Sequence, residues 1–341
     1  GKLGQAGVDH RLRMSGLPAP AEPWIAILLH DHTARYLRER QFSDLWQQRI
    51  PADAGHDPEA CWRTLDRLAG TGRRGIDMER LARLLSRNPP PVDVAVTEPG
   101  QPGPLLGTIH GSKGREAETV LLHLPPADSS GDADGAALAE ECRVLFVGAT
   151  RARTTLHICV ASRSYAGTYG ADGRTFKKLQ KHSSGIPRAR VELGRAGDVD
   201  QALQVSRDGY ACGADAYAVQ EVLGELTWST EPVTAAMEGN GNWTYQLFPE
   251  GQEDALPVGF LSEPEVNGAL FGIAGQFGRG HKPPDKIPHL RLIGTGTAAL
   301  APDDPRRPEL YPPYDQSGIF LVPVISGFPT VIFPWKSRRY R

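Results

Sequence analysis

The sequence predicts an α/β fold: a parallel sheet with flanking helices, followed by a smaller β-rich C-terminal domain. Three observations predict it. From residue 104 to residue 160, short apolar runs alternate with a polar turn and a helix-periodic segment, as in a parallel sheet. Beyond residue 185, Gly and Pro separate short β-like runs. The length of 341 residues fits about two domains.

Before residue 100 the apolar pattern predicts a strand, three helices and a second strand. In chain order these elements are a buried strand over 24–29, a helix over 33–49 with Thr33 as its N-cap, two helices within 57–87 divided at 70–72, and a strand over 92–96. The preceding residues 1–23 are rich in Gly and Pro, so we expect a poorly ordered lead-in.

The middle of the chain predicts strand, turn, strand, helix and strand. The expected elements are strands over 105–109, 120–124 and 156–160, a polar turn over 110–116, and a helix over 136–150. Residues that handle ligands lie beyond the carboxyl ends of strands in parallel sheets. The turn over 110–116 lies at such a position, which makes it the first candidate for a functional site.

The C-terminal part predicts mainly β-structure. The expected strands cover 190–193, 243–248, 271–274, 319–325 and 330–333, and a helix is expected over 214–226. The domain plan that follows has a lead-in over 1–23, an α/β domain over 24–162 with a short helical insert near 51–90, a basic linker over 163–185, and a β-rich domain of unknown role over 186–341.

Composition and charge exclude several classes of protein. The net charge is −2, so any contact with nucleic acid is local rather than a property of the whole surface. No apolar run approaches the roughly 18 residues of a membrane span. The four cysteines are scattered without a CxxC pair, which argues against a disulfide scaffold or a structural zinc site and favours the cytoplasm.

One stretch of the chain is strongly basic. Its cationic residues are Arg163, Arg174, Lys177, Lys178, Lys181, Arg188 and Arg190, against the single acid Asp172. Two interpretations stay open: a solvated basic face, or a segment that contacts phosphate groups.

The strongest candidate site begins at the turn after residue 107. Thr108, His110, Lys113 and Glu116 place hydroxyl, imidazole, ammonium and carboxylate groups on one strand-to-loop passage, and Gly114 allows close approach of the backbone. Such a turn suits phosphate or sugar recognition, because the hydroxyl and ammonium groups donate to anionic oxygens. A carboxylate repels phosphate but accepts from a ribose hydroxyl. The alternative is a solvated turn.

A second segment, residues 140–153, is rich in arginine. Arg143, Arg151 and Arg153 accompany a helix whose other face is apolar. An arginine fixed at a helix end can stabilise the charge that develops on a transferring γ-phosphoryl group. The alternative is that Glu140, Glu141 and Arg143 form surface ion pairs, which contribute little.

Together the two segments resemble a known family. The pattern TxHxxKGxE, an apolar strand, and then EExRxxFVxxTRA resemble motifs V and VI of superfamily 1 DNA helicases of the UvrD/Rep type. The resemblance covers roughly residues 105–160. It implies a second RecA-like domain over 24–162, which closes on a first RecA-like domain to hold ATP between them. The sequence departs from the family pattern at two positions. Arg115 stands where the family usually has an apolar residue, and Ala117 stands where the family often has an aromatic residue.

The resemblance also implies roles for individual residues. Arg151 would sense the γ-phosphate as an arginine finger, while Gly114 and Glu116 would approach the nucleotide, with Glu116 at the ribose. Thr108 and His110, with Lys113 beside them, would face single-stranded DNA and couple it to the nucleotide. The partners implied are therefore ATP, single-stranded DNA and a first RecA-like domain.

The sequence contains no GxxxxGK[ST] loop and no acidic pair after an early apolar strand. We therefore expect Mg²⁺ to be held mainly by a Walker A-bearing domain, in the same or another chain, and we expect no ATP hydrolysis by this chain alone. Two hypotheses follow: the C-terminal motor half of an ATP-dependent DNA helicase, or a non-catalytic DNA- or protein-binding module that keeps the RecA-like shape. Intact Glu116, His110 and Arg151 favour the first.

Overall fold

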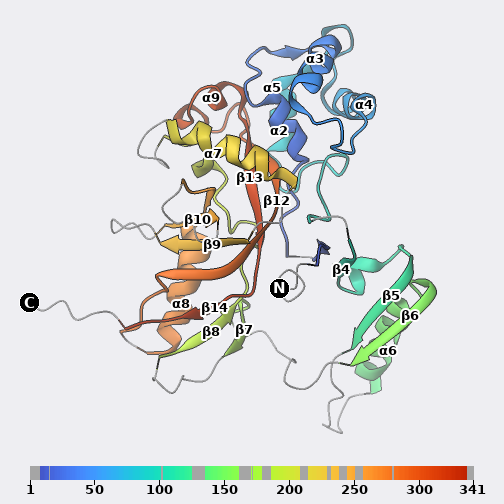
Figure 1. The fold of residues 1–341 in the computed structure, drawn as a ribbon, viewed down its shortest axis with the longest axis vertical. Coiled ribbons are helices and arrows are strands. Elements are labelled where there is room, and N and C mark those ends of the chain that lie inside the picture. Colours follow the sequence, from blue (N-terminus) through green and yellow to red (C-terminus); the bar gives the residue numbers. More distant parts are fainter. Residues whose placement is uncertain are drawn as a thin grey trace, which may run out of the picture.

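The architecture was obtained as a computed structural model. It describes residues 8–14, 16–100, 103–124, 135–160, 170, 172–178, 186–207, 214–228, 232–237, 244–249, 256–278 and 280–335. Figure 1 shows a group of helices in blue, a small unit of strands and one helix in green, and a larger β-rich part in yellow to red.

The basic stretch is described only in part. Arg163 and Lys181 lie outside the described residues, as do the side chains of Lys177 and Lys178.

The blue part contains short helices and one small strand pair. Its elements are α2 (Pro23–Leu29), β2 (Tyr36–Leu37), α3 (Glu39–Arg49), α4 (Pro58–Ala69), β3 (Ile76–Asp77) and α5 (Met78–Leu85). Asp57 and Asp77 begin α4 and α5, because each carboxylate accepts hydrogen bonds from backbone N–H groups of the first turn. The two helices predicted within 57–87 are confirmed.

Two predictions in this part are wrong. The run 24–29 forms α2 instead of a strand: Pro23 stands in its first turn, and six of its seven residues are buried. A helix buried all round shows no amphipathic period, so a short apolar run does not distinguish it from a strand. Residues 92–96 form a turn with one isolated bridge at Ala95. Val92 is 83% exposed there, and Val94 is the residue of this run that joins the core.

The helix predicted over 33–49 exists but begins later. It starts at Glu39, with Arg38 as the N-cap residue, and the side chain of Gln41 accepts a hydrogen bond from the Arg38 backbone N–H at 3.0 Å. Thr33 is therefore not its cap, because the chain between it and Glu39 first pairs as β2 with β3. Phe42 and Trp46 are the buried residues of this helix.

The green unit has the predicted order of strand, turn, strand, helix and strand. It consists of β4 (Leu105–Gly107), the short helical turn η2 (His110–Ser112), β5 (Ala117–Leu124), α6 (Gly135–Ala149) and β6 (Ala152–Val160). β5 and β6 pair in parallel over most of their length. From the lead-in, β1 (Arg11–Arg13) pairs in parallel with β4. The α/β class is thus confirmed.

The remaining part is β-rich, as predicted. A sheet in the order β11-β10-β9-β12-β13 is antiparallel throughout, and a smaller sheet has the order β14-β8-β7. Their strands are β7 (Thr175–Lys178), β8 (Arg188–Val191), β9 (Pro232–Met237), β10 (Tyr245–Pro249), β11 (Gly259–Phe260), β12 (Lys286–Ala299), β13 (Ile319–Ser326) and β14 (Thr330–Ile332). The helices are α7 (Ala214–Glu225), α8 (Gly268–Gln276) and α9 (Tyr314–Ser317).

One element of this part differs from the prediction. Residues 271–274 lie within α8 and do not form a strand. Leu270, Ile273 and Ala274 are buried on one side of that helix, whereas Phe271 is 41% exposed. Four apolar residues are too few to show this spacing, so the sequence pattern favoured a strand.

The main core joins the blue helices to the β-rich part. α2 packs against β12 and β13, and α5 packs against β12. Thr297 of β12 fixes this contact: its hydroxyl donates to the carbonyl of Glu22 at 2.7 Å and accepts from the N–H of Ala26 at 2.9 Å. The hydroxyl thereby satisfies a backbone donor that the first turn of a helix otherwise leaves free.

Among the described residues, no helix combines the length and the apolar character that a membrane crossing requires.

Candidate nucleotide and nucleic-acid site

The turn after β4 is held by its own hydroxyl groups. The N–H of Gly111 donates to Thr108 Oγ1 at 3.1 Å, and Ser112 Oγ donates to the carbonyl of Ile109 at 2.7 Å. These bonds close the helical turn η2 and leave His110 exposed. The turn is therefore a small, locally fixed platform between β4 and β5.

Lys113 and Gly114 complete the turn on its exposed side. Gly114 has a φ of +78°, in the left-handed region that favours glycine. A side-chain carbon added there would meet no atom within 4 Å, so the backbone of this position is open to an incoming group. Lys113 is exposed and forms no ion pair among the described residues. The two residues can approach an anionic ligand without displacing protein atoms.

Arg151 lies two residues after the end of α6 and joins the two predicted segments. Its Nε donates to the carbonyl of Val147 at 3.0 Å, and its Nη1 donates to the carbonyl of Arg115 at 3.1 Å. Nη2 lies 3.1 Å from the hydroxyl oxygen of Thr150. None of the carboxylates in the described part of the chain pairs with it, so its charge is held in place by neutral groups.

Gly148 allows α6, the helix that precedes Arg151, to approach β5. A side-chain carbon at Gly148 would lie 3.0 Å from a methyl carbon of Leu122 and 3.3 Å from Ile109. A larger residue would push α6 away from β5. The close packing therefore sets the position of Arg151 relative to the turn.

Glu116 and Arg153 form an ion pair at the other end of the turn. Arg153 Nε lies 3.0 Å from Glu116 Oε2, and Arg153 Nη1 lies 3.8 Å from Glu118 Oε1. All three side chains are exposed, so these pairs contribute little to stability. This ion pair brings Glu116 beside Arg153, two residues after Arg151. A ribose contact by Glu116 stays a prediction.

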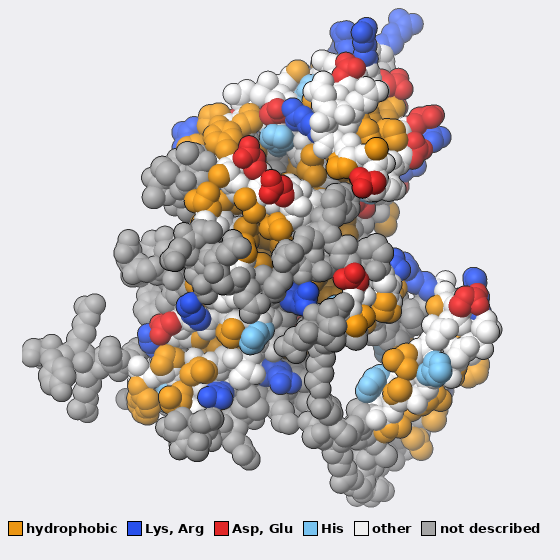
Figure 2. All heavy atoms as spheres, viewed as in Figure 1, with side chains coloured by type: hydrophobic (Ala, Val, Ile, Leu, Met, Phe, Trp, Pro, Cys, Tyr) orange, Lys and Arg blue, Asp and Glu red, His pale blue; other side chains and the backbone are white. Residues whose placement is uncertain are grey.

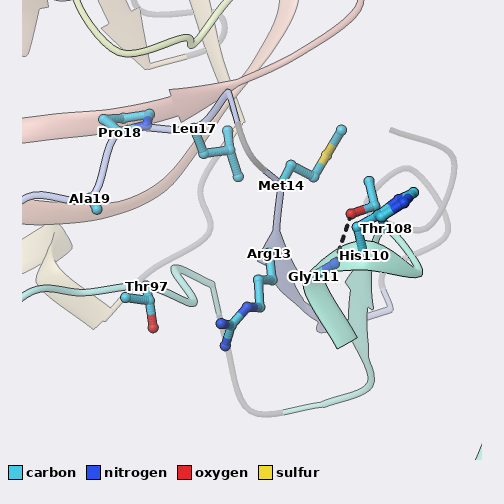
Figure 3. Close-up of a pocket in the computed structure, with 9 residues that line it drawn as sticks. All are labelled: Arg13, Met14, Leu17, Pro18, Ala19, Thr97, Thr108, His110 and Gly111. Atoms are coloured by element: carbon cyan, nitrogen blue, oxygen red, sulfur yellow. Dashed lines mark hydrogen bonds between the residues drawn. The ribbon is translucent and has the colours of Figure 1, made fainter. Parts of the chain in front are cut away.

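A cavity of about 510 Å³ lies next to Thr108 and His110. The sequence assigned no role to the other residues around it, and Figure 3 shows their arrangement. The lining residues are Arg13, Met14, Leu17, Pro18, Ala19, Thr97, Thr108, His110 and Gly111. Figure 3 shows Arg13 between Thr97 and the turn that carries Thr108 and His110. The turn therefore faces a hollow that is lined in part by the N-terminal segment.

Sequence reasoning missed a cluster of arginines beside this cavity. Arg11 and Arg13 of β1 bind the carboxylate of Glu98 at 3.3 and 3.1 Å, and Arg115 binds the same carboxylate. One residue in the sequence could have indicated this cluster: Arg115 stands where the resembled helicases usually have an apolar residue. The position of Glu98, however, depends on contacts between segments far apart in the sequence.

The structure also corrects the interpretation of Arg174. The sequence placed it in the basic stretch, with phosphate contact as one possibility. Its guanidinium is 11% exposed and pairs with the fully buried carboxylate of Asp198. Arg174 is therefore an internal ion-pair residue and is not available to phosphate. From the same stretch, Arg188 and Arg190 lie on β8.

In the part of the chain that the structure describes, no group of three or more His, Cys, Asp or Glu side chains could hold a metal ion. The exposed ammonium group of Lys113 and the open backbone at Gly114 do fit the oxygens of a phosphate group.

The parallel β5–β6 pair, the helix α6 between them and the turn that precedes β5 form an α/β unit of the kind expected for a RecA-like domain. Residues 105–159 match the family described as UvrD-like helicase C-terminal domain. This match supports the resemblance of these residues to the C-terminal portion of UvrD/Rep-type helicases. No curated protein and no solved structure gives a significant match.

Proposed function

We propose that the chain is the C-terminal motor half of an ATP-dependent DNA helicase. It contributes Arg151 as the arginine finger, with Gly114 and Glu116 at the nucleotide and Thr108, His110 and Lys113 at single-stranded DNA. The observation that carries the proposal is the position of Arg151, whose guanidinium joins the two motif segments and has no carboxylate partner among the described residues. Bound ATP would supply the phosphoryl group whose transfer drives the motor.

The chemistry of Arg151 supports its proposed role. A guanidinium held by carbonyl oxygens keeps its full positive charge, and arginine remains protonated at all ordinary pH values. The bonds to Val147 and Arg115 also restrict its position before any ligand arrives. A charge fixed in advance stabilises a transition state without reorganisation. Arg151 is therefore suited to meet negative charge that grows on a transferring phosphoryl group.

The exposed apolar surface of the green unit supports the idea of a half-site. Leu122 is the one hydrophobic side chain recorded as buried among the described residues of 105–160. Leu121, Phe146, Ile158 and Val160 are each more than half exposed. Figure 2 shows hydrophobic side chains in orange over this lobe, at the right of the view. Parallel sheets are normally covered on both faces, so this surface fits the docking of a further domain.

The missing part of the site is the loop that cradles the β- and γ-phosphates. The sequence has no GxxxxGK[ST], and the described residues offer no metal-binding cluster. The proposal therefore places the phosphate-binding loop and Mg²⁺ on a Walker A-bearing domain, in the same or another chain. The cytoplasmic location expected from the cysteines stays a prediction.

The proposal predicts weak binding of ATP by this chain alone. Triphosphate affinity in this class depends on the absent loop, so we expect a dissociation constant of about 1 mM or weaker. Isothermal titration calorimetry of the chain with ATP and Mg²⁺ measures it. Binding in the micromolar range would contradict the idea of a half-site.

One observation favours the alternative, a non-catalytic binding module. All the guanidinium nitrogens of Arg151 already contact Val147, Arg115 and Thr150, as they would in a purely structural role. The two functions differ in what loss of Arg151 does: a structural role lowers stability, whereas a catalytic role lowers turnover in a stable protein.

A further inference from the structure

We propose that Arg11, Arg13 and Arg115 form a phosphate-binding site for single-stranded nucleic acid, at the cavity beside Thr108 and His110. The inference deepens the proposed nucleic-acid contact and rests on it. It assigns a function to the N-terminal strand β1 and to Arg115, to which the motif resemblance gives none.

The charge of the cluster is the first argument. The guanidinium groups of Arg11, Arg13 and Arg115 all bind one carboxylate, that of Glu98. One negative charge cannot neutralise three positive ones, and these arginines pair with no other carboxylate among the described residues. The Glu98 side chain is 15% exposed, whereas the three arginine side chains are 32–46% exposed. The excess positive charge therefore faces outward, where an anion can reach it.

The strand geometry is the second argument. Arg11 and Arg13 are two residues apart on β1, so their side chains leave the same side of the strand. Their Cα partners on β4 are Leu105 and Gly107, directly before the turn at Thr108. Arg11 Nε is also buried without a hydrogen-bond partner within the described structure. The parallel pairing of β1 with β4 therefore places the guanidinium groups of Arg11 and Arg13 next to the turn that carries Thr108 and His110.

The cavity is the third argument. Its volume of about 510 Å³ lies within the range of ligand sites. Arg13, Thr108 and His110 line it with groups that can donate to phosphate oxygens. Met14 and Leu17 provide an apolar wall. A nucleotide unit has both chemistries, since its phosphate is anionic and its base presents an apolar face.

Glu98 competes with an incoming phosphate in this proposal. Its carboxylate is the shared partner of all three guanidinium groups when no ligand is bound. A phosphate that arrives shares or replaces this carboxylate as their partner. Removal of the Glu98 charge should therefore strengthen binding of an anion, whereas removal of an arginine should weaken it. Such opposite effects would not result if the cluster only stabilised the fold.

The test uses the full chain and a fluorescently labelled dT oligonucleotide, with binding measured by anisotropy over a range of salt concentrations. We expect Arg13→Gln to weaken binding about tenfold. The slope of log affinity against log salt should fall by about 0.7 for each arginine that contacts a phosphate, so the double variant with Arg11→Gln should lose about twice as much. Glu98→Gln should bind more tightly than the wild type.

A matched control removes an equal charge elsewhere. Arg67 on α4 forms a one-to-one pair with Asp93 at 2.6 Å, so Arg67→Gln should keep both affinity and slope. Circular dichroism confirms that each variant is folded, and calorimetry with ATP should give the same result for Arg13→Gln as for the wild type.

The outcomes separate the two proposals. If the wild type binds the oligonucleotide and Arg13→Gln keeps its affinity and slope, the arginine site is overturned while the helicase proposal stands. If Arg13→Gln changes binding of ATP but not of the oligonucleotide, the ligand is a free nucleotide and the inference is overturned. If the wild type does not bind the oligonucleotide at all, the nucleic-acid contact of the proposed function fails, and the arginine site with it.

Discussion

Replacing Arg151 with alanine is expected to reduce ATP turnover by about 10³-fold or more in protein that includes a Walker A-bearing domain. The loss corresponds to about 4 kcal/mol of transition-state stabilisation. ATP affinity should fall much less, because the charge that Arg151 meets grows mainly in the transition state. Steady-state turnover and ATP binding, measured on the same preparation, separate the two effects.

A matched control lies on α6, the helix that precedes Arg151. Arg143 is exposed on α6 and pairs with Glu140 at 3.0 Å, one turn away. Its replacement by alanine should leave turnover within about twofold of the wild type, because an exposed ion pair contributes little. Near-normal turnover of Arg151→Ala would refute the arginine-finger role. A loss of thermal stability with unchanged turnover would favour the non-catalytic module.

Asp198→Ala is expected to destabilise the protein by about 3–5 kcal/mol, the cost of leaving a buried charge without its partner. The carboxylate of Asp198 is fully buried and pairs with Arg174, with Nη2–Oδ1 and Nη1–Oδ2 distances of 2.6 and 3.0 Å. It also accepts hydrogen bonds from the backbone N–H groups of Gly194 and Arg195 at 2.8 and 3.0 Å. Urea denaturation of the wild type and the variant measures the difference.

The loop around Asp198 has little freedom to relax. Gly194 has a φ of +96°, and an added side-chain carbon there would lie 2.1 Å from the carbonyl oxygen of Ile325. The control is Asp303→Asn, which breaks an exposed pair with Arg83 and should cost no more than about 1 kcal/mol. If Asp198→Ala costs as little as this control, the buried pair is not a structural anchor of the β-rich part.

The fold was predictable wherever the pattern was long or had clear boundaries. The order of strands and helix over 105–160 follows from apolar runs separated by a polar turn, and Asp57 and Asp77 begin their helices as typical N-caps. The runs 24–29 and 271–274 were assigned wrongly because both are short and buried. In such runs the choice between helix and strand depends on the packing around them, which the sequence pattern does not contain.

The candidate site was predictable in its local part only. Thr108, His110 and Arg151 lie in two motifs whose residue types and spacing indicate their chemistry. Glu98 and Arg13 meet across a separation of 85 residues, through a strand of three residues that has almost no sequence signal. Arg174 was placed among the solvent-facing cations because its partner Asp198 follows the basic stretch. Whether an arginine is free or paired depends on such distant acids.

The central claim is that this chain supplies one half of an ATP site. The most direct measurement is DNA-stimulated ATP hydrolysis by the chain alone, by a Walker A-bearing RecA-like domain alone, and by the two joined. We expect turnover well above background only when both are present, because Arg151 and the phosphate-binding loop act on the same phosphoryl group. The claim would be contradicted if the chain alone turned over ATP as fast as the two parts joined. It would also be contradicted if joining the two parts gave no increase in turnover.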